Sequence, residues 1–164
     1  MPRHAETRIV AYTPAQMFDL VADVARYPQF LPWCVGARVR ERREGALRAD
    51  MTIGFGPFRE SFTSHVTLDR PAEGGAGRIT VRYENGPFKY LNNSWDFIAD
   101  PRGCKVDFLV DFEFRSALLR AAIGVVFNEA TRRMVNAFLI RARTIYGVGI
   151  APISTDASIG QIGT

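Results

Sequence analysis

The sequence predicts an α+β fold, with about seven antiparallel strands in one curved sheet, two short helices and a long C-terminal helix. Two observations carry this prediction. Apolar and polar residues alternate with a period of two between 35 and 115, which is typical of antiparallel strands with one dry and one wet face. Apolar residues then follow helical spacing to about Tyr146. We therefore expect the helix to lie across the dry, concave face of the sheet.

The predicted elements follow in chain order. Residues 6–12 form a first strand, and Thr13 with Pro14 marks a helix start, because a cap-type residue precedes a proline at the first helical position. That helix breaks near Tyr27 and Pro28, and the segment YPQFLPWC (27–34) predicts an irregular apolar linker. Six further strands are separated by the turn sequences REGA, GFGPF, RPAEGGAG, ENGPF and DPRG. Ser116 caps the long helix.

Composition favours one soluble domain over residues 1–147, followed by a Gly/Ser-rich flexible tail over 148–164. The net charge of +4 is modest. No run of about 18 apolar residues exists, and the first residues have neither signal-peptide nor transit-peptide character. Cys34 and Cys104 are far apart in the sequence, so we expect reduced thiols and a cytoplasmic protein.

The chain carries little that predicts catalysis or metal binding. His4 and His65 are the only histidines, and neither has a partner at metal-ligand spacing. Nucleotide-binding and hydrolase motifs are absent. Cys34 lies in an apolar segment and is expected to be a buried, inert thiol. Acid–base chemistry inside the fold would have to come from Tyr83, Glu129 or Arg133, and no catalytic residue is predicted.

The stretch SALLRAAIGVVF (116–127) is apolar on nearly every side of the predicted helix. In a meander alternate turns share one end, so the turns GFGPF and ENGPF should lie beside the start of this helix. The linker that feeds the first meander strand arrives there too. The parity argument therefore gathers an apolar pole with a basic rim: Phe30, Leu31, Trp33, Phe58, Phe88, Leu118 and Leu119, with Arg59, Lys89, Arg115 and Arg120.

Four explanations of this pole remain open from the residues alone. It suits attachment to an anionic membrane surface. It equally suits the mouth of a cavity for a lipophilic ligand, or a protein contact patch. The fourth explanation is that the loops fold over one another and close the core.

A long helix over a curved sheet need not fill the concavity, so a lipophilic ligand site is expected inside. The alternative is a filled core. The predicted lining is apolar apart from the Tyr83 hydroxyl, Ser64 and Asn93. Its members are Phe62, Val66, Val81, Tyr83, Trp95, Phe97, Phe108, Val110, Phe112, Met134 and Phe138.

An arginine run occupies the solvent side of the first meander hairpin: Arg38, Arg40, Arg42, Arg43 and Arg48. A solvated strand face is the default interpretation. The run is also the best candidate for RNA contact, although no aromatic residues interleave with it as single-strand binders usually require. No DNA partner is expected.

Three segments together resemble the coenzyme Q-binding START-like family of the polyketide cyclase/dehydrase superfamily: YPQFLPWC (27–34), GPFKYLNNSWDF (86–97) and VDFEFRSALLRAAIGVVFNEATRRMVNAF (110–138). The family includes mitochondrial ubiquinone-binding proteins and bacterial ribosome-association toxin relatives. The resemblance implies a helix-grip fold, as in START-like and Bet v 1-like proteins. It implies that Tyr27, Pro28 and Pro32 belong to the mouth. It also implies that Leu91 belongs to the sheet wall and that Val125, Val126 and Phe127 belong to the helix side of the site.

The resemblance also implies a function. It implies a non-enzymatic carrier for ubiquinone or a similar polyprenyl lipid that supports respiratory electron transport or quinone biosynthesis. Such a protein would be bacterial and cytoplasmic, with peripheral contact at the inner membrane face, and would need no catalytic cofactor. A toxin-like protein that binds the large ribosomal subunit is the alternative. A cyclase or dehydrase type of enzyme ranks third.

Overall fold

The computed structural model describes residues 2–73 and 75–148. The predicted flexible tail therefore lies outside the described residues, apart from Val148. The elements in chain order are β1 (Arg3–Val10), α1 (Pro14–Ala22), the 3-10 helix η1 (Val24–Gln29), β2 (Cys34–Arg43), β3 (Ala46–Phe55), β4 (Phe58–Asp69), β5 (Gly77–Asn85), β6 (Phe88–Asp100), β7 (Gly103–Phe114) and α2 (Ala117–Tyr146).

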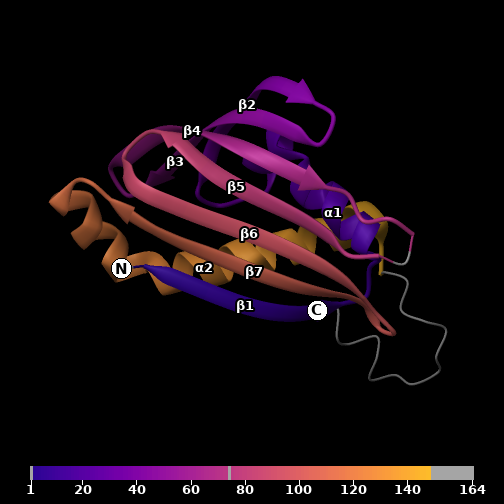
Figure 1. Ribbon diagram of the computed structural model, residues 1–164. Helices are drawn as coiled ribbons and strands as arrows, with labels where there is room; N and C mark the ends of the chain where they lie inside the picture. Colours follow the sequence, from indigo (N-terminus) through magenta and orange to yellow (C-terminus); the bar gives the residue numbers. More distant parts are fainter. Residues whose placement is uncertain (1, 74, 149–164) are drawn as a thin grey trace.

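The seven strands form one antiparallel sheet in the order β1-β7-β6-β5-β4-β3-β2. Strands β2 to β7 are a continuous meander, and β1 completes the sheet by pairing with β7. The sheet is strongly curved, and α2 runs along its concave side, with α1 near the end of the sheet where α2 finishes (Figure 1). This arrangement confirms the predicted α+β class with a long C-terminal helix across a curved sheet.

The first strand differs from its prediction, because β1 starts at Arg3 and ends at Val10 instead of spanning 6–12. Val10 pairs with Cys104, next to the turn that joins β6 to β7. Beyond that point Ala11 and Tyr12 leave the sheet and are buried one after the other. The Tyr12 hydroxyl donates to the Gly147 carbonyl at 2.8 Å, which ties this segment to the end of α2. Two adjacent buried residues do not follow the alternation of a strand, so the sequence pattern did not predict the end of β1.

Both main helices begin where the capping residues predicted. Thr13 and Gln16 form a reciprocal capping box, in which Gln16 N donates to Thr13 Oγ1 at 3.0 Å and Thr13 N donates to Gln16 Oε1 at 2.9 Å. At α2 the Ser116 hydroxyl accepts from Leu119 N at 3.3 Å. These bonds satisfy backbone donors that a helix start leaves unpaired.

The buried side chains divide into two clusters at the two ends of the concave face. One packs under α1, η1 and the second half of α2, and includes Phe18, Phe97, Trp95 and Phe138. The other packs under the first turns of α2, where Phe88 stacks on Phe114 with ring centroids 4.8 Å apart. The space between the two clusters is the candidate site.

Candidate functional site

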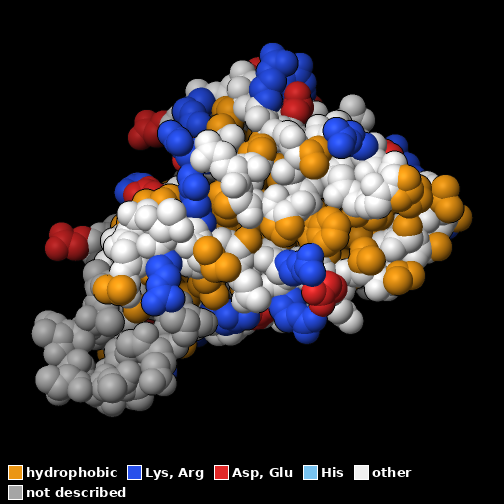
Figure 2. Space-filling view, turned by 180° about the vertical axis from the view of Figure 1, so that it is seen from behind, with side chains coloured by type: hydrophobic (Ala, Val, Ile, Leu, Met, Phe, Trp, Pro, Cys, Tyr) orange, Lys and Arg blue, Asp and Glu red, His pale blue; other side chains and the backbone are white. Residues whose placement is uncertain are grey.

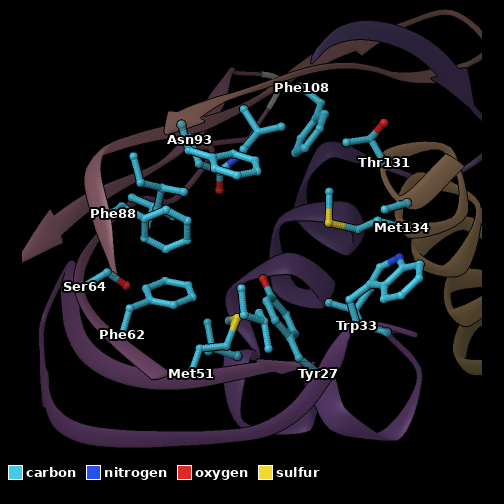
Figure 3. A pocket seen from close by; sticks show the side chains of 18 of the residues that line it. Tyr27, Trp33, Met51, Phe62, Ser64, Phe88, Asn93, Phe108, Thr131 and Met134 are labelled. Atoms are coloured by element: carbon cyan, nitrogen blue, oxygen red, sulfur yellow. The ribbon is translucent and has the colours of Figure 1, made fainter. Parts of the chain in front are cut away.

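A cavity of about 220 Å³ lies between the middle of α2 and the concave face of the sheet. Side chains from the sheet, from η1 and the linker that follows it, and from α2 point into it (Figure 3). Trp95, Phe108 and Phe138 come from one core cluster, and Phe62, Phe112 and Phe127 come from the other. The cavity is therefore the gap that the two clusters leave where they meet.

The gap exists because the residues facing it from the centre are small. Helix α2 contributes Ala130 and Thr131 there, and the sheet contributes Ser64, Val81 and Val110. The aromatic side chains stand further towards the ends of the concave face. Protein interiors are normally packed without space of this size, so the arrangement suits an apolar guest.

Most residues of the predicted lining line this cavity. They are Phe62, Val66, Val81, Leu91, Trp95, Phe108, Val110, Phe112, Phe127, Met134 and Phe138. The cavity decides against a completely filled core. That these side chains bind a ligand stays a prediction.

Two residues of the predicted lining, Phe97 and Tyr83, do not line the cavity. Phe97 is 0% exposed, because α1 covers that end of β6 and the Phe97 ring packs edge-on against Phe18 with centroids 6.0 Å apart. Tyr83 turns towards the β5–β6 turn, where its hydroxyl oxygen accepts a hydrogen bond from Phe88 N at 3.1 Å. Both side chains lie on the inward-facing side of their strands, as the alternation predicted. They lie at strand ends that the cavity does not reach.

Several cavity residues were missing from the predicted lining. Met51 and Ile53 extend the wall along β3, and Ile123 and Thr131 extend it along α2. Alternation along β3 and helical spacing along α2 place these side chains inward, so the signal was present. It did not show which part of each element would face the gap.

Polar atoms on the wall are few, and several are already bonded within the protein. The Thr131 hydroxyl donates to the Phe127 carbonyl at 3.0 Å, and the Tyr27 hydroxyl donates to the Val21 carbonyl. Burial raises the pKa of Tyr27 well above its usual value of 10.0. Asn93 Nδ2 donates to the Leu109 carbonyl at 2.7 Å.

The predicted mouth residues divide between three places. Tyr27, Leu31, Trp33 and Phe88 line the cavity. Phe30 packs on Phe138 with centroids 5.3 Å apart, beside the second half of α2 and away from the β3–β4 and β5–β6 turns. Phe88 is 2% exposed and Leu119 is 7% exposed, so both belong to the core. For Phe88 and Leu119 the fourth explanation holds: the turns fold inward and close the core.

The basic rim is partly engaged within the protein. Arg120 Nη1 donates to the Phe114 and Arg115 carbonyls at 3.1 and 2.8 Å, which closes the end of β7 against the start of α2. Lys89 lies 3.5 Å from the Glu113 carboxylate. Arg59 is exposed, and Phe58 is half-buried against the Phe55 ring.

The first turns of α2 nevertheless keep an exposed apolar face. Leu118 is 66% exposed and Val125 is 85% exposed, and Ala117, Ala121 and Gly124 are exposed beside them. Hydrophobic side chains gather at this end of the molecule on the face that carries α2 (Figure 2). This exposed face is what remains of the predicted pole.

The groups considered for acid–base or nucleophilic chemistry lie outside the cavity or are held neutral. Glu129 is exposed and pairs with Arg132 and Arg133, whose guanidinium groups lower its pKa. Burial raises the pKa of Cys34 to about 11, so this thiol is protonated at neutral pH. Within residues 2–73 and 75–148, no group of three His, Cys, Asp or Glu side chains is arranged to hold a metal ion.

The arginine run lies along β2, an edge strand, and the neighbouring β3. Arg48 donates to Glu84 of β5 through two nitrogens at 2.9 and 2.6 Å, and Arg40 lies 3.5 Å from Asp50. Arg38, Arg42 and Arg43 are exposed and have no ion-pair partner in the described part of the chain. No helix among the described residues has both the length and the apolar character needed to cross a membrane.

A curved seven-stranded sheet that holds a long helix over an apolar cavity defines a helix-grip protein of the START-like and Bet v 1-like class. The chain belongs to the polyketide cyclase/dehydrase and lipid transport family, whose model matches residues 10–139.

Curated relatives carry two kinds of name. The chain is 37% identical to a protein of Pseudomonas aeruginosa named ribosome association toxin RatA, a match that covers 85% of this chain and 94% of that one. A Vibrio cholerae protein of the same name is 38% identical, over 90% of this chain and 99% of that one. The mitochondrial coenzyme Q-binding protein COQ10 homolog B of Xenopus laevis is 32% identical, over 95% of this chain and 64% of that one.

Solved structures agree with the fold. An 18 kDa protein of Caulobacter crescentus is 36% identical and superposes with a TM-score of 0.70, over 90% of this chain and 99% of that one. An aromatase/cyclase of Streptomyces sp. R1128 also has a TM-score of 0.70, over 90% of this chain and 96% of that one. At 19% identity that enzyme shares the fold alone.

Proposed function

We propose that this protein is a non-enzymatic carrier that holds ubiquinone or a similar polyprenyl lipid in the cavity. The observation that carries the proposal is the apolar cavity between α2 and the sheet, in a chain that resembles a protein named for coenzyme Q binding. The role would be to support respiratory electron transport or quinone biosynthesis in the bacterial cytoplasm.

The size of the cavity defines which part of the lipid it encloses. Sites that enclose drug-sized ligands usually measure about 300–1,000 Å³, whereas this cavity measures about 220 Å³. A ring with a short stretch of chain fits such a space, and a long polyprenyl tail has to leave it. Half-buried Trp33 on one side and Val126 and Ala130 on the other line the seam that we propose as the mouth.

The exposed apolar face of α2 supports a contact with the inner membrane. Leu118 and Val125 project outward from α2 on the N-terminal side of the mouth. Apolar side chains of this kind insert into the boundary between lipid headgroups and acyl chains. A tail that leaves the cavity could then pass directly into the bilayer.

The first test is mass spectrometry of lipid extracted from detergent-free protein that was purified from a quinone-producing host. The proposal expects a quinone or polyprenyl species at near-stoichiometric amount. Added short-chain quinone should also quench tryptophan fluorescence, because Trp33 and Trp95 both line the cavity. An empty extract together with unchanged fluorescence would refute the carrier function.

A second candidate function is binding to the large ribosomal subunit. Two observations favour it: several relatives are named ribosome association toxin, and three unpaired arginines lie on the exposed edge strand β2. Cationic side chains without internal partners are available to phosphate groups.

Cosedimentation with purified ribosomes tests this candidate. Reversal of Arg38, Arg42 and Arg43 to glutamate should abolish cosedimentation and leave quinone binding intact. The matched control reverses Arg3, Arg115 and Arg143, which are exposed on other elements and give the same change in net charge. If the unmodified protein does not cosediment, or both triple variants behave alike, the arginine strand is not a ribosome-binding surface.

A further inference from the structure

Asn93 presents a hydrogen-bond acceptor to the cavity. Its side chain projects from β6 into the space, and Nδ2 donates to the Leu109 carbonyl of β7 at 2.7 Å. A carbonyl oxygen only accepts, so the amide must turn its nitrogen towards Leu109. Oδ1 therefore points the other way, into the cavity (Figure 3). An amide oxygen is likewise an acceptor only.

No described residue donates to Asn93 Oδ1. The residues directly across from Asn93 are Val81 on β5 and Val110 on β7, and both valines line the cavity. An acceptor in apolar surroundings is poorly satisfied until a donor reaches it, and a buried polar group left unpaired is costly. The atom that completes this site must carry a hydrogen.

One other polar atom on the wall is free to meet a ligand. Ser64 on β4 is 5% exposed, its side chain points towards the cavity (Figure 3), and its hydroxyl has no hydrogen-bond partner among the described residues. Trp33 Nε1 also has no hydrogen-bond partner in the described part of the chain, but it is fully buried and does not face the cavity. A hydroxyl can donate or accept. The wall thus offers one obligate acceptor and one hydroxyl.

We infer that the cavity selects the reduced, hydroquinone form of its lipid over the quinone, an inference that rests on the proposed carrier function. Both ring oxygens of a quinone are carbonyl acceptors, so one of them beside Asn93 Oδ1 would be repelled. A hydroquinone or a prenylated phenol can donate its O–H to Asn93 Oδ1. Its oxygen atoms can still accept from the Ser64 hydroxyl.

The experiment compares ubiquinol and ubiquinone that carry the same single isoprene unit, titrated into the purified protein by calorimetry under argon. We expect the quinol to bind roughly tenfold more tightly, since a site that pairs its polar group with the ligand discriminates against an analogue that leaves the group unpaired. Asn93→Leu should weaken quinol binding by a similar factor and leave quinone binding unchanged or stronger.

Thr131→Val is the matched control. Thr131 also lines the cavity, but its hydroxyl donates to the Phe127 carbonyl of its own helix, so the variant should keep the preference for quinol. Equal affinities for the two forms, tighter binding of the quinone, or a preference that persists in Asn93→Leu would overturn the inference and leave the carrier function standing. If neither form binds, both proposals fail. The unmodified protein decides the question even where Asn93→Leu does not fold.

Discussion

At the scale of single residues, the two cysteine thiols are buried and protonated at neutral pH because of where the fold places them. Cys34 is 6% exposed and Cys104 is 0% exposed. Burial raises the pKa of Cys34 to about 11 and that of Cys104 to about 12, because the thiolate would be desolvated. Thiolate is the reactive form of cysteine, so the sequence-based prediction of an inert Cys34 thiol agrees with its surroundings.

The raised thiol pKa values predict that the protein loses stability at high pH. The unfolded chain releases the Cys34 proton near its ordinary pKa of 9.0, whereas the folded chain retains it to about 11. The unfolded state therefore binds fewer protons in this window, and the free energy of unfolding falls as pH rises from about 9 to about 11. Urea denaturation at a series of pH values measures this slope, and Cys34→Ala should make it shallower. A flat profile, or an unchanged slope in Cys34→Ala, would contradict the prediction.

Gly124 offers a second prediction at this scale. It lies on the exposed side of α2, and a Cβ built there meets nothing within 4 Å. Because glycine in a helix interior is less favourable than alanine by about 1 kcal/mol, Gly124→Ala should stabilise the protein by roughly 0.5–1 kcal/mol in chemical denaturation.

Gly86→Ala is the opposite case. Gly86 has φ +150° and its added Cβ would lie 2.5 Å from Phe62 Cβ, so this variant should be clearly less stable.

At the scale of elements, the junction between β7 and α2 is held by an arginine whose charge does not face outward. Arg120 bonds the carbonyls of Phe114 and Arg115, the last residues before the helix cap. Hydrogen bonds to charged groups are stronger than neutral ones. Arg120, which was predicted to be part of a basic rim, thus connects the end of the sheet to the start of the helix through these hydrogen bonds.

Arg120→Ala should therefore lower the free energy of unfolding by about 1 kcal/mol, since two carbonyls lose their donor. Thermal and urea denaturation provide the measurement. Arg115→Ala is the matched control, because Arg115 is exposed at the same junction and should change stability by less than about 0.5 kcal/mol. Equal effects of the two variants would show that charge alone, and not the carbonyl bonds, explains the role of Arg120.

At the scale of the whole molecule, the cavity follows from the way one helix bridges a curved sheet. The aromatic clusters support α2 near its two ends, and small side chains such as Ala130 leave the middle open. A larger residue at Ala130 should fill the space with little effect on the two clusters.

We expect Ala130→Phe to abolish quinone binding, measured by quenching of tryptophan fluorescence, while far-UV circular dichroism stays unchanged. Overpacking is expected to destabilise the fold by about 1–3 kcal/mol. Ala121→Phe places the same side chain on the exposed face of the same helix and should bind as the unmodified protein does. Retained binding in Ala130→Phe would mean that the ligand lies elsewhere.

Alternation and capping signals were sufficient to predict most of the elements, although β1 begins and ends earlier than predicted. The period of two in CKVDFLVDFEFR gave β7, and Ser116 gave the start of α2, because strand faces and helix caps depend on a few neighbouring residues. The cavity was harder to predict. Tyr83 and Phe97 have the right periodicity, but each lies beyond the part of its strand that faces the gap, where another element covers it.

The apolar pole shows the same limit more sharply. Leu118 and Leu119 are adjacent and chemically identical, yet one is 66% exposed and the other is 7% exposed. Phe58 and Phe88 occupy matching positions in two similar turns, yet only Phe88 is fully enclosed, because its ring packs between Phe62 and Phe114.

The sequence alone determined most of the strands and helices, and which face of each is dry, because these properties follow from local spacing. Only the tertiary structure decided how far α2 stands from the sheet and which inward side chains meet each other. That distance depends on the sum of many side-chain volumes at contacts far apart in the sequence. It separates a core residue such as Phe97 from a cavity residue such as Asn93, although both alternate along the same strand.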